Sequence, residues 1–193
     1  MEEATVPGIA VQDLTARLRC CSEADFSNVA LIRQILRDNP VHPDSIERYL
    51  VWDSQHYTRN LIEKTPLFEV MAICWEVGQG SSIHNHKDQN CWMAAPMGRL
   101  LVQNYRVLRQ DVTAGSCDLE PTDIIEMNAM NPCAVDPAEP VHRVYNPAEF
   151  KQRAVSLHVY SRPYDSCLVY DDQKHKCGEI KLSYTSQYGL VHK

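Results

Sequence analysis

The stretch Gly80-Ser81-Ser82-Ile83-His84-Asn85-His86 decides the fold of this 193-residue chain. Two histidines one residue apart point to the same side of an extended strand, because side chains alternate across the pleat. Two imidazoles on one face can occupy two adjacent positions on a metal ion. The turn-forming Gly78-Gln79-Gly80 precedes the pair, and Cys91 and Gly98 follow it in a second expected strand. The pattern therefore predicts a metal site carried by a β-sheet.

The size and charge of the chain narrow the range of functions. With 193 residues, 44% of them hydrophobic, residues 1–193 can bury the core of a single domain. The formal net charge is -6 and basic residues form no large cluster, which disfavours nucleic acid and membrane surfaces as partners. The acidic segment Met1–Pro7 has no long apolar run and is not a secretory signal. We therefore expect a cytoplasmic monomer that acts on a small molecule.

The eight cysteines do not indicate a disulfide framework, because the chain carries no secretory signal. No two of them have the Cys-x-x-Cys spacing, which argues against a zinc ribbon. We interpret Cys20, Cys74 and Cys133 as small buried hydrophobic residues. Cys91 is different, because it follows the histidine pair closely.

The hydrophobic period of the chain changes near Leu67. Before it, apolar residues recur at helical spacing in Val11–Leu18, Asn28–Leu36 and Pro43–Leu50. After it, short runs of strand-forming residues alternate with turn signals. The clearest runs are Phe68–Val77, Leu100–Val107, Ala154–Tyr160, Cys167–Tyr170 and Ile180–Tyr184. This order predicts a mainly β fold, with a barrel or jelly roll over about 57–189 and a helical layer over about 11–50 packed on one side.

Two segments resemble the paired motifs of the cupin superfamily. The first runs from the histidine pair to Gly98, with Cys91 where many cupins carry a metal-binding Glu. The second ends in His142, with Asn146 four residues later, and lacks the Pro-x-Gly that usually precedes it. A lone histidine is more often an ordinary core or surface residue. Beside a strand-spaced pair, however, His142 is predicted to be the third metal ligand.

Three imidazole ligands have a consequence for the chemistry of the site. They leave a divalent ion with its full charge, whereas a carboxylate in the set would cancel one unit of it. Such an ion readily accepts an anionic sulfur ligand. Imidazole suits several transition metals, so the ligand type does not select among them. Three open positions on an octahedral ion would accommodate a bidentate substrate and dioxygen.

The chain as a whole resembles cysteine dioxygenase, a thiol dioxygenase family of the cupin superfamily. Order and spacing hold from about the first helix to Gly189. The matching segments are Tyr57–Asn60, Gly80–His86, Cys91, His142–Val144, Ala154–Ser161 and Pro163–Cys167.

This resemblance implies an Fe(2+)-dependent oxidoreductase of cysteine catabolism. Such an enzyme adds both atoms of dioxygen to the sulfur of L-cysteine and yields cysteine sulfinic acid. Carried over by position, the metal would be held by His84, His86 and His142. Arg59 would clamp the substrate carboxylate, helped by Tyr57, since a guanidinium binds a carboxylate in a bidentate geometry that lysine cannot copy.

The resemblance also implies a thioether bond between Cys91 and Tyr160. Ser156 and His158 would hold the Tyr160 hydroxyl through a hydrogen-bond chain. The spacing is consistent with this, because residues 156, 158 and 160 share one side of a strand. A solvent-facing strand with ordinary alternation is the alternative interpretation of the same pattern.

Three residues depart from the family. Arg162 replaces a proline of vertebrate members and could place a second cation near the pocket. Asn85 and Lys87 replace residues that are acidic or small in relatives. They should face away from the metal, and we interpret them as neutral changes.

Two other functions fit parts of the pattern. A dioxygenase of another small thiol, such as 3-mercaptopropionate, typically carries Gln and Gly in place of Arg59 and Cys91. A cupin that binds a small molecule without turnover would need neither Arg59 nor Tyr160. Oxygen uptake with iron and L-cysteine distinguishes the second alternative, because a binding protein would show none.

Overall fold

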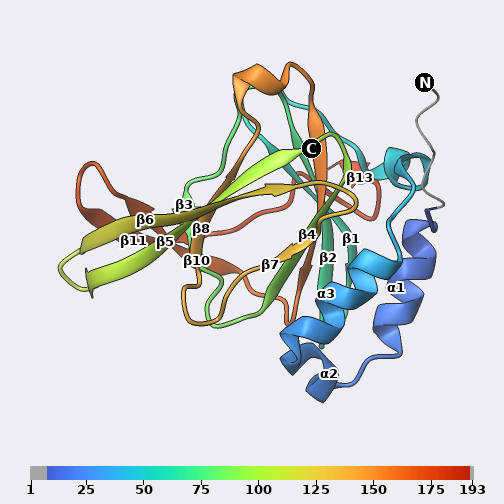
Figure 1. The fold of residues 1–193 in the computed structure, drawn as a ribbon, viewed down its shortest axis with the longest axis horizontal. Helices are drawn as coiled ribbons and strands as arrows, with labels where there is room; N and C mark the ends of the chain where they lie inside the picture. Colours follow the sequence, from blue (N-terminus) through green and yellow to red (C-terminus); the bar gives the residue numbers. More distant parts are fainter. Residues whose placement is uncertain (1–7, 192–193) are drawn as a thin grey trace.

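Short helices form the N-terminal layer in a computed structural model that describes residues 8–191 (Figure 1). The segment Met1–Pro7 and His192 lie outside the described residues. Two helices match the predicted segments closely, and the third predicted helix is a 3-10 helix. The elements are α1 (Val11–Arg19), α2 (Glu23–Ser27), α3 (Val29–Asp38) and η1 (Pro43–Tyr49).

The sequence analysis missed α2, since five residues are too few to show a helical period. Its start is nevertheless specified locally by a capping box, in which the Ser22 hydroxyl accepts from the Asp25 N–H. Asn28 caps α3 in the same way, by accepting from the Leu31 N–H at 3.1 Å. Pro40 follows the end of α3, where a helix could not continue.

The strands form two groups. The first is a seven-stranded sheet in the order β13-β12-β1-β2-β9-β4-β7, and the second is a six-stranded closed barrel in the order β10-β11-β6-β5-β8-β3. This mainly β architecture, with helices on one side, confirms the predicted fold class. The strands are β1 (Thr58–Lys64), β2 (Glu69–Trp75), β3 (Ile83–His84), β4 (Cys91–Met97), β5 (Leu100–Asp111), β6 (Ser116–Met127), β7 (Cys133–Ala134), β8 (Val141–Tyr145), β9 (Ala154–Tyr160), β10 (Ser166–Asp171), β11 (Lys176–Lys181), β12 (Ser186–Gln187) and β13 (Leu190–Val191).

The central strands β2 and β9 are buried along their whole length. Alternate residues of β2 belong to different cores. Val70 and Ala72 pack with the helices. Met71 and Ile73 pack between the sheet and the six barrel strands, in a cluster that we call the barrel core. Burying side chains of this size stabilises the fold by roughly 1.5–3 kcal/mol each. The helices therefore turn what would be a solvent-facing side of the sheet into a second core.

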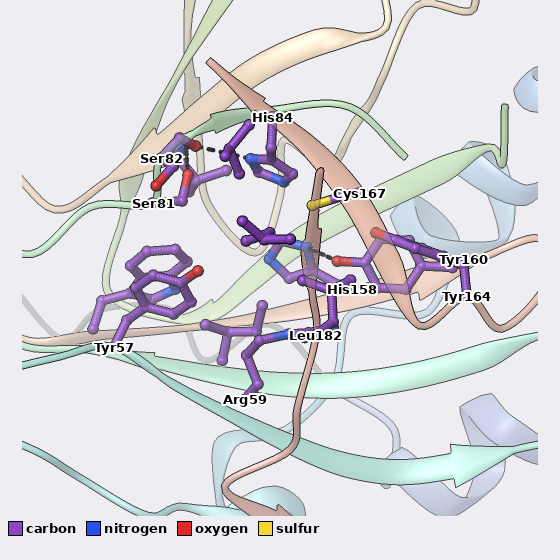
Figure 2. A pocket seen from close by; sticks show the side chains of 15 residues that line it. Tyr57, Arg59, Ser81, Ser82, His84, His158, Tyr160, Tyr164, Cys167 and Leu182 are labelled. Carbon is purple, nitrogen blue, oxygen red and sulfur yellow. Dashed lines mark hydrogen bonds between the residues drawn. The ribbon is translucent and has the colours of Figure 1, made fainter. Parts of the chain in front are cut away.

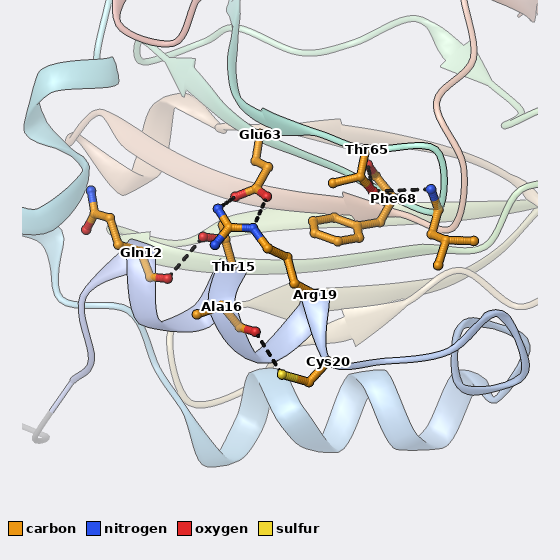
Figure 3. A network of polar contacts seen from close by, with 9 residues as sticks. Gln12, Thr15, Ala16, Arg19, Cys20, Glu63, Thr65 and Phe68 are labelled. Carbon is orange, nitrogen blue, oxygen red and sulfur yellow. Dashed lines mark hydrogen bonds and ion pairs between the residues drawn. The ribbon is translucent and has the colours of Figure 1, made fainter.

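The helical layer is attached mainly by apolar contacts. Phe26 of α2 stacks on Phe68 with ring centroids 5.4 Å apart. In addition, Arg19 of α1 donates to both carboxylate oxygens of Glu63 on β1, at 2.6 and 2.8 Å (Figure 3). Arg19 is more than half exposed, so this ion pair contributes at most about 1 kcal/mol. The packing, not the ion pair, holds the layer in place.

The cysteines follow the predictions only in part. Cys74 and Cys133 are buried, which confirms their interpretation as core residues. Cys20 is exposed, so the same interpretation was wrong there. The reason is its place just after the last turn of α1, where its thiol contacts the Ala16 carbonyl (Figure 3). None of the helices in residues 8–191 is long and apolar enough to cross a membrane.

Candidate active site

Three histidines meet where β3 and β8 pair. His84 and His142 are directly opposite each other in this antiparallel pair. The strand β3 ends at His84, so His86 lies beyond it, and the next residues, Lys87 and Asp88, turn with positive φ. One ligand atom from each of the three histidines lies within 4.8 Å of the others. The strand spacing thus brings the pair together even though the strand itself is only two residues long.

The approach to this site depends on a glycine. Gly80 forms a bridge with Tyr145 at the end of β8. A Cβ on residue 80 would lie 2.9 Å from the Cβ of Tyr145, which is too close for any other residue type. The glycine therefore lets the segment before β3 lie against β8, and so helps to align His84 with His142.

The donor set fits a single metal ion. All four ring nitrogens of His86 and His142 are buried and have no hydrogen-bond partner among residues 8–191. Leaving buried polar groups unpaired costs about 1–3 kcal/mol each, and a metal ion bound through one nitrogen of each ring would offset part of this cost. His84 Nδ1 lies 2.9 Å from the Ser82 carbonyl, to which it donates, so its Nε2 remains available as a ligand (Figure 2).

Burial keeps these imidazoles neutral. It lowers the pKa of His84 to about 4, and it holds the pKa values of His86 and His142 well below their ordinary range. Neighbouring histidines add to the effect for His86 and His142. A neutral imidazole has the lone pair that a metal requires. The three side chains are therefore ready to bind a cation near neutral pH.

A polar row on β9 lies beside the histidines. The Trp75 indole N–H donates to Ser156 Oγ at 2.9 Å, and this oxygen lies 2.8 Å from His158 Nε2. His158 Nδ1 in turn lies 3.2 Å from the Tyr160 hydroxyl (Figure 2). All four residues are buried, so β9 is not a solvent-facing strand. Trp75 was not foreseen as the start of this chain, because nothing local in the sequence links it to Ser156.

Cys91 and Tyr160 are directly opposite each other in the β4–β9 pair. Residues opposed in this way have Cβ atoms about 4.5–5.5 Å apart. Both side chains belong to the barrel core, and burial raises the pKa values of the thiol and the phenol well above their ordinary range. A hydrogen bond with Tyr160 partly offsets the rise for Cys91. The register thus brings together the two residues expected to form a thioether.

Arg59 of β1 shares a small cavity with His84, His158 and Tyr160 (Figure 2). Its Nη1 donates to the Ser183 carbonyl at 3.2 Å. Its positive charge lowers the pKa values of nearby groups, partly opposing the rise that burial causes in Tyr160. The remaining lining residues are Tyr57, Ile73, Trp75, Ser81, Ser82, Val144, Tyr164, Cys167, Val169, Ile180 and Leu182.

Sequence reasoning foresaw only part of this lining. Tyr57 stacks on Trp75 with ring centroids 4.7 Å apart, so its ring forms one wall. The Tyr164 ring lies edge-on to the Tyr160 ring, with the ring centroids 5.1 Å apart. Cys167 lines the same cavity (Figure 2). Both fell within a segment that resembles the family, but their alternation along the chain gave no signal of a role.

The departures from the family have structural roles. Arg162 forms an ion pair with Glu23 of α2 and is not among the residues that line the cavity. The Asn85 Oδ1 accepts from the Leu168 N–H at 3.0 Å, and Lys87 Nζ lies 2.6 Å from Glu179. Asn85 and Lys87 therefore hold the loop after β3 against β10 and β11.

A β-barrel that gathers three histidines in one candidate metal site defines a metal-binding cupin. The family model for cysteine dioxygenase type I matches residues 1–173, so the chain belongs to that family of the cupin superfamily. This agrees with the family resemblance identified from the sequence.

Curated relatives support this placement. The chain is 29% identical over 181 residues to the cysteine dioxygenase type 1 of Danio rerio, covering 93% of this chain and 88% of the relative. It is 28% identical to that of Rattus norvegicus and 27% identical to that of Homo sapiens, each over 184 residues. Both of these alignments cover 92% of this chain and 87% of the relative.

Proposed function

We propose that this protein is an Fe(2+)-dependent dioxygenase that converts L-cysteine and dioxygen to L-cysteine sulfinic acid. The observation that carries the proposal is the placement of Arg59 and His84 in one cavity. A single guanidinium beside a three-histidine metal site suits a small ligand that has both a thiol and a carboxylate. The names of the curated relatives point to the same substrate.

In this proposal His84, His86 and His142 hold the iron. When bound, iron(II) supplies the electronic coupling that lets dioxygen react with a thiolate sulfur. Arg59 binds the carboxylate in a bidentate manner, and the Tyr57 ring closes one wall of the cavity. Fixing the substrate in this way brings the sulfur close to its reaction partner, which accounts for much of the expected rate.

Tyr160 acts as a positioned hydroxyl in the same proposal. Burial raises its pKa, so the phenol stays protonated near neutral pH and can donate a hydrogen bond into the cavity. The chain from Trp75 through Ser156 and His158 fixes its direction. A Cys91–Tyr160 thioether would fix the ring further. It forms by joining the sulfur to the ring carbon beside the hydroxyl, with two hydrogens lost to dioxygen as oxidant.

Oxygen consumption by iron-reconstituted protein tests the proposal. L-Cysteine, 3-mercaptopropionate and cysteamine would be supplied in turn, and the sulfinate product would be identified by mass spectrometry. We expect L-cysteine to be the preferred substrate, with one dioxygen consumed for each sulfinate formed. Preference for 3-mercaptopropionate would reassign the substrate, and no uptake with any thiol would favour a binding protein. The single domain, the monomeric state and the cytoplasmic location stay predictions.

A further inference from the structure

A buried carboxylate lies inside the barrel, outside the set of groups used above. Glu69 begins β2 and is fully buried, directly opposite Tyr160 of β9. Its Oε2 accepts from the Tyr184 hydroxyl at 2.6 Å, while its Oε1 has no hydrogen-bond partner in the part of the chain that the structure describes. Because β2 alternates, Glu69 shares its face with Met71, which belongs to the barrel core. Glu69 therefore points toward the side of the sheet that carries the cavity.

Tyr184 links this carboxylate to the substrate clamp. The Arg59 guanidinium carbon lies 5.7 Å from the centre of the Tyr184 ring, within the range of a cation–π contact. Residues on either side of Tyr184 hold Arg59 as well. The Thr185 N–H donates to the Arg59 carbonyl at 2.7 Å, and Ser183 accepts from the guanidinium. Leu182, at the start of this segment, lines the cavity beside Arg59 (Figure 2).

The charges around the pair are consistent with an anchoring role. Lys64 Nζ donates to the Tyr184 hydroxyl at 3.2 Å and lies 3.8 Å from Glu69 Oε2. Burial raises the pKa of Glu69, and this is the largest effect on it. The hydrogen bond from Tyr184 and the charges of Lys64 and Arg59 lower the pKa by smaller amounts, in that order. A phenol that donates to this carboxylate has its hydroxyl end fixed, so the Tyr184 ring is held in place beside Arg59.

Stability alone does not account for this carboxylate. Replacing a buried charged group by an apolar residue of similar volume is often neutral or stabilising. Groups that violate the usual rules for a protein core are expected where function requires them. Tyr184 contacts both Glu69 and Arg59, which suggests that the carboxylate serves to position Arg59.

We propose that Glu69 and Tyr184 form a positioning pair that orients Arg59 and so sets the preference for thiols that carry a carboxylate. The inference rests on the proposed function, because it assigns Arg59 to the substrate carboxylate. A bidentate contact needs the guanidinium plane held in one orientation, and the anchored ring supplies one face of that support. Neither residue touches the substrate.

Three variants test the pair, and a fourth serves as a control. Tyr184→Phe removes the hydroxyl and keeps the ring, Glu69→Met removes the acceptor, and Glu69→Gln keeps an acceptor of the same shape. Tyr188→Phe is the matched control, because Tyr188 is half exposed and lies in the same C-terminal segment. Each iron-loaded protein would be titrated without oxygen with L-cysteine and with cysteamine, by calorimetry. Steady-state kinetics with both thiols and thermal unfolding would follow.

We expect Tyr184→Phe and Glu69→Met to weaken L-cysteine binding by about tenfold, with cysteamine binding unchanged. KM for L-cysteine should rise while kcat changes little. Glu69→Gln and Tyr188→Phe should keep the wild-type preference, and Glu69→Met should unfold at no lower temperature than wild type.

Three outcomes would overturn the pair without touching the proposed function. One is an unchanged preference in both Tyr184→Phe and Glu69→Met. Another is an equal loss for both thiols, which indicates a general structural role. If Tyr188→Phe lost the preference as strongly, the effect would belong to the whole segment and the pair would be overturned too. A wild-type protein that binds neither thiol would instead refute the proposed function, and this inference with it.

Discussion

The two faces of β9 share their burial but not their chemistry. Toward the helices, Val155, Leu157 and Val159 pack in an apolar core. Toward the barrel interior, Ser156 and His158 belong to a chain of hydrogen bonds beside the metal site. A strand of seven residues thus carries both a core that stabilises the fold and part of the candidate active site. The comparison teaches that burial does not distinguish the two roles here, whereas the pairing of polar atoms does.

The largest effect should follow from removing a metal ligand on the interior face. His142→Ala leaves two imidazoles, and we expect iron binding and activity to fall by more than about 100-fold, beyond what loss of a supporting partner costs. Iron content and oxygen uptake would measure both. His175→Ala is the control, because His175 is exposed and pairs with Asp118. Full iron content and turnover in His142→Ala would show that the ligand assignment is wrong.

Removing the cation of the cavity should have the next largest effect. Arg59→Ala should lower kcat/KM for L-cysteine, because a charge-assisted contact with the substrate carboxylate is lost. The expected loss of transition-state stabilisation is about 2–5 kcal/mol. Arg59→Lys should recover only part of it, since lysine cannot bind the carboxylate in a bidentate manner. Cysteamine turnover should change little in both variants. Unchanged kinetics with L-cysteine in Arg59→Ala would remove Arg59 from the site.

A substitution that opens a cavity on the helix-facing side of β9 should lower stability and leave the chemistry of the site unchanged. Leu157→Ala should lower the free energy of unfolding by about 2–5 kcal/mol, because Leu157 is almost fully buried in that core. Urea denaturation would measure the change, and Leu108→Ala, at a mostly exposed position, is the control. Iron affinity at low temperature should be retained. A loss of iron with unchanged stability would contradict the division between the two faces.

Acid should destabilise the metal-free protein through the interior face. The pKa values of His84 and His158 are lowered to about 4 and about 3. Their contribution to stability is therefore present above the unfolded value of 6.5, and it is lost as pH falls through the folded values. The loss should reach about 1.4 kcal/mol per pH unit for each histidine.

Urea denaturation of metal-free protein at pH 7, 6 and 5 would measure this slope. Glu69 acts in the opposite sense, because its raised pKa favours the folded state at low pH and that contribution is lost as pH rises. We expect the histidines to dominate, since four of them are buried and neutral. A constant free energy of unfolding between pH 7 and 5 would show that they do not.

The smallest effect should come from the expected crosslink. After aerobic turnover with L-cysteine, a digest of the wild-type protein should contain a linked Cys91–Tyr160 peptide. Cys91→Ser should lack the linked peptide. Its activity should fall by no more than about tenfold, since the Tyr160 hydroxyl keeps its contact with His158. Cys133→Ser is a matched control, because Cys133 is buried in the same core. Separate peptides after repeated turnover would refute the crosslink and leave the dioxygenase proposal standing.

Local pattern alone was enough for much of this protein. The spacing of His84 and His86 predicted a metal site, and the change of period near Leu67 predicted helices followed by a mainly β barrel. Capping residues and apolar spacing act over a few positions, so they can be read without the fold. Helix α2 was missed because its five residues make little more than one turn, too few for a helical repeat to show.

Tertiary structure decided the contacts between residues far apart in the chain. Strand register placed Trp75 on Ser156 and Cys91 opposite Tyr160. The folding of the loops between strands brought Tyr184 to Glu69, 115 positions away. It also sent Arg162 to Glu23 on α2 and away from the cavity. Side-chain alternation gives the face on which a residue lies, but only the pairing of whole strands gives its neighbour there. For that reason the sequence alone could indicate the candidate metal ligands, while the contacts that link Arg59, Tyr184 and Glu69 became visible only in the folded chain.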